Sequence, residues 1–308
     1  MAKSLGIAFG GGSARGLAHI GVLKVLEKNG IPISYISGTS MGALIGGLYA
    51  AGLSALKLED IALNLTGKQV VKLFRPTLTH SGFIDGDKIS SFLSSLIPKR
   101  DMEKTNIPFK TIATDFSTGG KYIISKGDLF EAIRASCSIP VIFSPAVIND
   151  RILLDGGLSV PLPTAVVREM GAEIVISVNV IPAPEYKKNV KIAGDENPVM
   201  KNLTEKLRSW KLLNVKKFER NIMNIDYDKE KKILPSVFNI SMQTRNIMEY
   251  NLIREDIITH KPDWLIEPNQ NVVLGWFEFN KAKEIIKNGE TAAVKIIDEL
   301  KRALSRAG

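Results

Sequence analysis

Two strand–turn–helix units at the start of the chain most constrain its fold. The first places an apolar run, Leu5 to Phe9, before a glycine-rich loop and a helical pattern that ends near Lys28. The second places Ile33 to Ser37 before a tight turn and a helical pattern that begins at Met41. Short apolar runs that alternate with helices are typical of parallel strands joined by helices. Further buried strands are predicted at residues 109–114, 152–154 and 174–180.

This alternation predicts an α/β fold with three layers, α/β/α, around a mostly parallel central sheet. Beyond residue 180 the sequence is mainly helical, with helices expected at 200–222, 236–257 and 281–304 and a short strand at 264–266. We expect residues 5–180 to form the core of the domain. Residues 181–308 are expected to complete the same domain with a helical insertion or lid (181–235) and a C-terminal helical extension.

Composition favours a globular domain in a reducing compartment. The 308 residues are 44% hydrophobic and 24% charged, which is ordinary for a soluble domain. The single cysteine, Cys137, cannot form an intramolecular disulfide. The uncharged stretch 31–56 is long enough to span a bilayer, but Pro32 and several glycines and serines favour a strand, a turn and a buried helix. We therefore expect a cytoplasmic protein.

The net charge of +9 is concentrated in one segment. Residues 186–232 contain 13 Lys or Arg and 7 Asp or Glu, and apolar residues recur there at helical spacing. A basic amphipathic helix suits the anionic inner face of a membrane, so peripheral contact there is one interpretation. The other is a surface helix with a solvated basic face. The chain has no nucleic-acid-binding motif, so no nucleic acid is expected.

A nucleophile motif occupies the turn of the second unit. Gly38 and Gly42 flank Ser40 in the pattern G-x-S-x-G, between an apolar strand and an apolar helix. In this context the pattern presents a serine hydroxyl on a sharp turn. Serine is a weak nucleophile alone, so it needs a neighbouring base and preorganised donors for the oxyanion that forms.

The glycine-rich loop of the first unit, Gly10 to Gly16, can supply those donors. Free backbone N–H groups where a strand passes into a helix favour a developing negative charge. A dinucleotide-binding loop is the alternative, since Gly10 and Gly12 fit its first two glycines. However, Arg15 stands where the third glycine belongs, and no acidic residue follows a second strand at the usual spacing.

The base has two candidates. Asp155 follows the apolar run 152–154 and precedes Gly156 and Gly157, as expected for a carboxylate at a strand end. The order Ser, Asp, His of α/β-hydrolases would instead recruit His260, the only histidine after Asp155. We expect His19 to be a packed residue, His80 to lie in a polar loop and Asp115 to be structural.

Taken together, these motifs resemble the bacterial patatin-like phospholipases. That family combines a glycine loop ending in Arg-Gly or Lys-Gly, a G-x-S-x-G serine and an Asp-Gly-Gly or Asp-Gly-Ala aspartate, in the order found here. The similarity covers roughly residues 5–180, including 113–115, 135–140 and 171–173, and returns at 276–293.

The resemblance implies a Ser-Asp dyad without histidine. Ser40 would attack an ester carbonyl, Asp155 would accept its proton, and the backbone N–H groups of Gly11, Gly12 and Ser13 would form the oxyanion hole. Many relatives carry glycine where Ser13 stands, so serine suits the position only if its backbone angles are ordinary. The supporting motif residues are Gly10, Arg15, Gly16, Gly38, Gly42, Gly156 and Gly157.

The implied function is a serine lipid acyl hydrolase, of phospholipase A or lysophospholipase type, acting on phospholipids or related lipid esters. A soluble carboxylesterase or thioesterase is an alternative, as is a membrane-associated regulatory protein with little turnover. The sequence has no calcium-binding loop and no zinc-ligand spacing, so neither a metal nor another cofactor is expected.

Overall fold

The computed structural model describes residues 3–64, 87–98, 100–140, 142–184, 237–269 and 278–305. The chain forms two compact units, one made of Met1–Pro184 with Asn246–Gly308 and the other of Glu185–Arg245. The second unit is described only at residues 237–245, where helix α10 (Val237–His260) begins. The fold and the candidate site below belong to the first unit.

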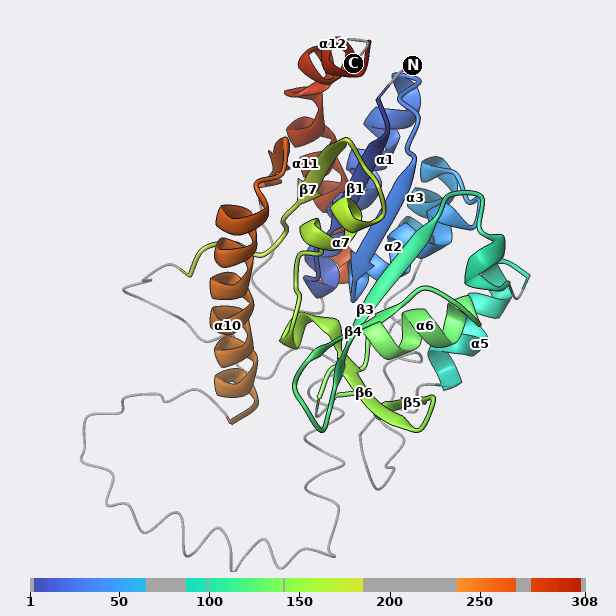
Figure 1. The fold of residues 1–308 in the computed structure, drawn as a ribbon, viewed down its shortest axis with the longest axis vertical. Coiled ribbons are helices and arrows are strands. Elements are labelled where there is room, and N and C mark those ends of the chain that lie inside the picture. The colour runs from blue at the N-terminus through green and yellow to red at the C-terminus, as the bar shows by residue number, and fades with distance from the viewer. Residues whose placement is uncertain are drawn as a thin grey trace, which may run out of the picture. The chain divides into compact units, whose positions relative to one another are not determined.

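A mixed, mostly parallel sheet forms the centre of this unit (Figure 1). The described strands follow the order β5-β6-β3-β2-β1-β7-β8, with β4 also paired to β3. The pairs β1–β2, β2–β3, β1–β7 and β7–β8 are parallel, whereas β4 and β6 run antiparallel to β3 and β5 runs antiparallel to β6. The strands are β1 (Leu5–Phe9), β2 (Tyr35–Thr39), β3 (Phe109–Asp115), β4 (Lys121–Ile124), β5 (Ala146–Ile148), β6 (Arg151–Asp155), β7 (Ile174–Val178) and β8 (Trp264–Ile266).

Helices cover both faces of the sheet, and β1 indicates why. Alternate strand residues point to opposite faces. Ile7 and Phe9 join the large core built with α1 (Ala18–Lys28) and α2 (Met41–Ala50), while Ala8 packs with Val167 of α7 (Thr164–Glu169). Because no residue of β1 reaches solvent, the strand is apolar throughout. The predicted three-layer α/β fold with a mostly parallel sheet is confirmed.

Two expectations for individual elements are corrected. The strand near residues 152–154 was expected to be buried on both faces, but β6 is antiparallel and near the sheet edge, and Ile152 is 44% exposed. The expected closing helix is two helices, α11 (Ala282–Val294) and α12 (Ile297–Ser305), separated by a turn. Apolar side chains of both helices face the core, because Ile285, Ile286 and Leu300 are buried.

Other boundaries lie close to their predicted positions. Strand β2 begins two residues later than expected, and α6 (Leu129–Ser136) begins directly after Asp128, whose side chain accepts hydrogen bonds from two N–H groups of its first turn. Helix α5 (Asp87–Leu96) begins at Asp87. The remaining helix of this region is α3 (Ala55–Asn64).

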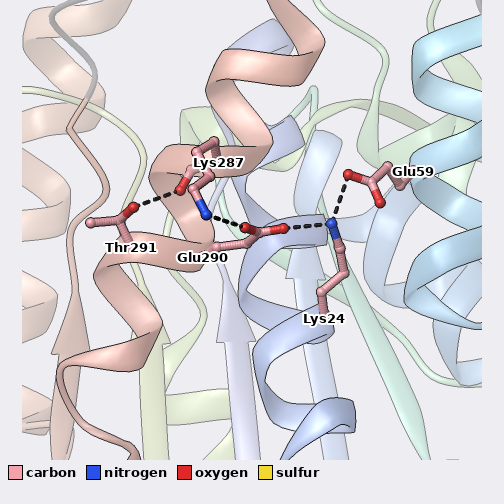
Figure 2. Close-up of polar contacts among 5 residues, drawn as sticks. All are labelled: Lys24, Glu59, Lys287, Glu290 and Thr291. Atoms are coloured by element: carbon pink, nitrogen blue, oxygen red, sulfur yellow. Dashed lines mark hydrogen bonds and ion pairs between the residues drawn. The ribbon is translucent and has the colours of Figure 1, made fainter.

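Helices α1 and α11 pack backbone against backbone. A Cβ atom at Gly289 would lie 2.0 Å from the carbonyl oxygen of Ala18, and one at Gly21 would lie 2.0 Å from that of Ile286. Beside this contact, Lys24 of α1 bonds to Glu290 of α11 and, at 2.7 Å, to Glu59 of α3 (Figure 2). The C-terminal helix α11 is therefore joined to the N-terminal helix of the domain.

Some predictions concern parts of the chain outside the described residues. These are the basic segment 186–232 and the loop around His80. Among the helices that the structure does describe, none combines the length and apolar character needed to cross a membrane.

Candidate active site

Ser40 lies at a sharp bend between β2 and α2. Its backbone has φ 53° and ψ −117°, a region that residues other than glycine rarely occupy. The bend requires a very close approach at Gly42, where a Cβ atom would lie 2.2 Å from the carbonyl oxygen of Phe9 and 2.7 Å from that of Gly10. At Gly38 a Cβ would lie 2.3 Å from the carbonyl oxygen of Gly42. The two motif glycines thus allow the serine turn to pack on the first strand.

Asp155 meets Ser40 at the end of β6. The Ser40 hydroxyl donates a hydrogen bond of 2.8 Å to Asp155 Oδ2. The other carboxylate oxygen, Oδ1, accepts the Gly157 N–H at 2.8 Å. The aspartate is fully buried and the serine is 4% exposed, so this pair is shielded from bulk water. Gly156 allows the chain to turn beside β3, since a Cβ there would lie 2.2 Å from the Ile112 carbonyl oxygen.

Two serines around the end of α6 hold the pair in place. The Ser40 N–H donates to Ser136 Oγ at 2.9 Å, and the Asp155 N–H donates to the Ser138 carbonyl at 2.9 Å. The Thr114 hydroxyl donates to the Asp155 carbonyl at 2.9 Å. The sequence resemblance covers 135–140, but the residue pattern gave no role for Ser136, because only the fold brings α6 beside the serine turn.

The glycine loop lies next to Ser40, but its first N–H groups are already bonded. A Cβ at Gly11 would be 3.5 Å from Ser40 Cβ. The Gly10 N–H donates to Val178 and the Gly11 N–H donates to Pro161, at 3.0 and 2.9 Å. The Gly11 N–H therefore extends the backbone pairing of the loop, and the oxyanion role expected for Gly11 stays a prediction. Among the described residues the Gly12 N–H makes no hydrogen bond.

Ser13 does not have the ordinary backbone angles that the sequence analysis required of a serine at this position. Its φ is 51°, so the backbone is left-handed where an ordinary conformation was needed for serine to replace glycine without strain. Ser13 begins the 3₁₀ helix η1 (Ser13–Leu17), which leads directly into α1. At Gly16 a Cβ would lie 2.7 Å from Met41 Cβ, so this turn packs on the first residue of α2.

Arg15 is the one charged residue of this loop, and it is buried. Its exposed fraction is 6%. Burial lowers the pKa of Arg15, and the carboxylates of Glu249 on α10 and of Glu278 oppose that shift. The guanidinium therefore lies in an acidic environment that spans the loop and two C-terminal segments.

Neither described histidine hydrogen-bonds to Ser40. His19 is fully buried on α1, and its Nε2 bonds to the Gly10 carbonyl at 2.8 Å. His260 is at the end of α10, where its Nε2 lies 3.8 Å from Asp256 of the same helix. Its side chain is 40% exposed. The expected packed role of His19 agrees with its burial.

Asp115, the other aspartate that follows a strand, has different partners. Its carboxylate accepts a 2.8 Å bond from Arg151 and further bonds from the Ser117 and Thr118 N–H groups. The hydrogen bond from Arg151, followed by that from the Thr118 N–H, lowers the pKa of Asp115. Within the described ranges no group of three or more His, Cys, Asp or Glu side chains could hold a metal ion.

A serine at a sharp strand-to-helix turn of an α/β sheet is the way in which many serine hydrolases present their nucleophile. A family model described as patatin-like phospholipase matches residues 7–167, just over half of the chain. The chain therefore belongs to the patatin-like phospholipase family.

The names of several similar proteins are consistent with membership of this family. An uncharacterized NTE family protein of Mycobacterium tuberculosis is 36% identical over 176 residues, which are 56% of this chain and 48% of that protein. Lysophospholipase NTE1 of Yarrowia lipolytica is 32% identical over 58% of this chain and 13% of its own length. Human patatin-like phospholipase domain-containing protein 6 is 28% identical over 68% of this chain and 15% of its own length. The chain thus spans about half of the mycobacterial relative and a small part of the eukaryotic ones.

Proposed function

We propose that this protein is a serine lipid acyl hydrolase that works through a Ser40–Asp155 dyad. The observation that carries the proposal is the 2.8 Å hydrogen bond from the Ser40 hydroxyl to Asp155 Oδ2, between two buried side chains. Hydrogen-bond contact between a nucleophile and its base is the geometric requirement for general-base catalysis. Family membership supports an ester of a lipid as the substrate.

The proposed reaction has two steps. Ser40 Oγ attacks the ester carbonyl while its proton passes to Asp155 Oδ2, and the acyl–enzyme forms as the alcohol leaves with that proton. Water then attacks the acyl–enzyme, gives a proton to Asp155, and releases the fatty acid while the proton returns to Ser40. The Gly157 N–H, bonded to Oδ1, keeps Oδ2 directed at the serine.

The oxyanion would bind to the glycine loop. We assign the leading donor to the Gly12 N–H, which follows the bonded Gly11 N–H in the buried loop, where a Cβ at Gly11 would lie 3.5 Å from Ser40 Cβ. A Cβ at Gly12 would lie 2.5 Å from Val180 Cγ2, so glycine is needed there. The N-terminus of η1 adds a small favourable field for negative charge.

The substrate class follows from the family and from one named relative. Lysophospholipase is part of the name of the Yarrowia lipolytica protein, so lysophospholipids and diacyl phospholipids are the first substrates to test. Peripheral membrane contact is a further part of the proposal. It is supported by the basic composition of residues 186–232 and by three exposed apolar side chains on neighbouring strands or their ends, Phe116, Val147 and Ile152.

The decisive experiment compares two substitutions with matched controls. Ser40→Ala should reduce hydrolysis of micellar phospholipid more than 1,000-fold, and Asp155→Asn should have an effect of the same order, on the scale typical of a missing nucleophile or base. Asp115→Asn alters an aspartate that follows a strand but does not contact Ser40, so it should retain turnover. Fatty acid release is the measurement, with circular dichroism as the check on folding.

Four outcomes separate the alternatives. A folded Ser40→Ala protein with wild-type turnover would contradict the proposal. A comparable loss in His260→Gln would favour the triad over the dyad. Failure of a fluorophosphonate probe to label Ser40 in the folded wild type, together with vesicle binding, would favour a regulatory protein with little turnover. Equal rates on short monomeric esters and on micelles would favour a soluble esterase.

A further inference from the structure

His19 is a buried titratable group that the proposed dyad does not use. It lies in the first turn of α1, six residues after Ser13, and has no exposed surface. Its ring packs on Phe9 with the centroids 4.8 Å apart and the planes inclined by 53°. Nothing in a packing role requires a histidine at this position rather than another ring, so its polar atoms need a separate explanation.

The hydrogen bond of His19 fixes its protonation. Nε2 lies 2.8 Å from the Gly10 carbonyl oxygen, which can only accept, so Nε2 carries the hydrogen and donates. Nδ1 is buried without a hydrogen-bond partner among the described residues. Burial lowers the pKa of His19 to about 4, although the bond to Gly10 opposes that change. The imidazole is therefore neutral at physiological pH, with one fixed tautomer.

That single bond acts on the peptide that precedes the proposed oxyanion donor. The Gly10–Gly11 peptide is held at its carbonyl by His19 and at its N–H by Pro161. The next peptide along the chain carries the Gly12 N–H. The same Gly10 carbonyl borders α2, because a Cβ at Gly42 would lie 2.7 Å from it. Rotation of the Gly10–Gly11 peptide would move the loop relative to Ser40.

We propose that His19 is a positioning residue, whose neutral Nε2–H locks the Gly10–Gly11 peptide so that the Gly12 N–H is directed at the oxyanion. This inference rests on the proposed hydrolase function and gives a histidine a role outside proton transfer. Loss of the donor leaves a buried carbonyl without its partner, which favours rotation of the peptide. The acid–base chemistry stays with Ser40 and Asp155.

Three substitutions at one position test this lock. Glutamine places an amide nitrogen as many bonds from Cα as His19 Nε2, whereas asparagine places its nitrogen at the distance of Nδ1. His19→Phe and His19→Asn should lower kcat by about 100-fold with little change in KM, as for a small misplacement of a reacting geometry. His19→Gln should recover most of that loss. Wild-type kcat in a folded His19→Phe protein would overturn the proposal, as would a His19→Gln protein no better than His19→Asn.

A second measurement does not depend on turnover or on the variants folding. Nitrogen-15 NMR of the imidazole in the wild-type protein should give the neutral Nε2–H tautomer for His19, without titration between pH 5 and pH 9. Titration in that range, or the Nδ1–H tautomer, would overturn the lock. If Ser40→Ala keeps full activity while NMR gives the neutral Nε2–H form, the hydrolase proposal fails and the geometry of His19 stands. If His19→Phe shifts the acid limb of the kcat/KM profile, the residue transfers a proton and positioning is wrong.

Discussion

Close approach of backbone to backbone occurs at both ends of the region around helix α1: in the contact of α1 with α11, and in the glycine loop that precedes α1. The two contacts differ in their backbone conformation and in their hydrogen bonding. Where α1 meets α11, glycines bring helix backbones together and Lys24 bridges Glu59 and Glu290 beside the contact (Figure 2). Before α1 begins, the glycine loop meets the serine turn, and two serines there have positive φ. The helix contact combines regular backbone with paired charges, whereas the loop contact holds strained backbone and the Gly12 N–H, which has no hydrogen-bond partner in the described part of the chain.

This difference indicates that the helix contact contributes to the stability of the fold, whereas the strained loop contributes to the geometry of the candidate active site. Left-handed or otherwise rare backbone at a residue other than glycine costs about 1–3 kcal/mol each and persists only where the surrounding structure enforces it. Ser13 and Ser40 carry such strain beside the proposed chemistry. The α1–α11 contact has regular helical backbone at the same close distances. We therefore expect changes at the helix contact to alter stability and changes in the loop to alter activity.

Gly289→Ala is the strongest way to break the helix contact. The new Cβ would lie 2.0 Å from the Ala18 carbonyl oxygen, a backbone atom, so α1 and α11 must separate. Overpacking of this kind costs about 3 kcal/mol, less the roughly 1 kcal/mol by which alanine favours a helix over glycine. The free energy of unfolding, measured by urea titration, should fall by about 2 kcal/mol.

The same variant tests whether the two regions are independent. Lys283→Ala, at an exposed position of α11, is the matched control and should leave the unfolding free energy within about 0.5 kcal/mol of wild type. Under conditions where it is folded, Gly289→Ala should keep its kcat. A large loss of kcat without loss of stability would mean that α11 positions the loop through α1. It would contradict the expectation that the helix contact determines stability and the loop determines activity.

Ser13→Gly should relieve strain in the loop without harm to the site. Glycine adopts a φ of 51° freely, so the substitution should raise the unfolding free energy by up to about 1 kcal/mol. Ser117→Gly is the control, since Ser117 has no positive φ and glycine there should be neutral or destabilising. Thermal unfolding measures both. A destabilised Ser13→Gly protein would mean that the Ser13 side chain contributes more than its backbone strain costs.

The sequence predicted the arrangement of the fold well because apolar runs and glycine turns are local signals. Strand β1 was predicted with its observed bounds, and Ser40 lies between a strand and a helix as predicted, although β2 extends past its predicted end at Ser37 to include Gly38. The direction of β6 could not be predicted, because three apolar residues before Asp155 suit a central parallel strand as well as an antiparallel strand near the edge. Pairing partners depend on contacts far apart in sequence.

Details of the candidate site were harder for the same reason. Nothing in the local pattern at Gly11 reveals that its N–H donates to Pro161, which lies 150 residues later in the chain. The contacts of Ser136 and His19 could not be predicted from the sequence either, since each side chain bonds to a backbone atom of another segment. The glycine that the family resemblance led us to expect in place of Ser13 was the one local sign of the left-handed backbone found there.

The smallest expected effect concerns the charges beside the helix contact. Burial alone would raise the pKa of Glu290, but hydrogen bonds from Lys24 and then Lys287 outweigh it and leave the pKa below its ordinary value of 4.5. A carboxylate with a lowered folded-state pKa stabilises the fold above its unfolded-state pKa and loses that contribution as pH falls through the folded-state value. Between pH 5 and pH 3, wild type should therefore lose about 0.5 kcal/mol more unfolding free energy than Glu290→Gln, the scale of a partly exposed ion pair.

Glu284→Gln changes an exposed glutamate of the same helix and is the matched control. Equal pH dependence in Glu290→Gln and wild type would mean that backbone packing at Gly21 and Gly289 holds α11 without help from the charges.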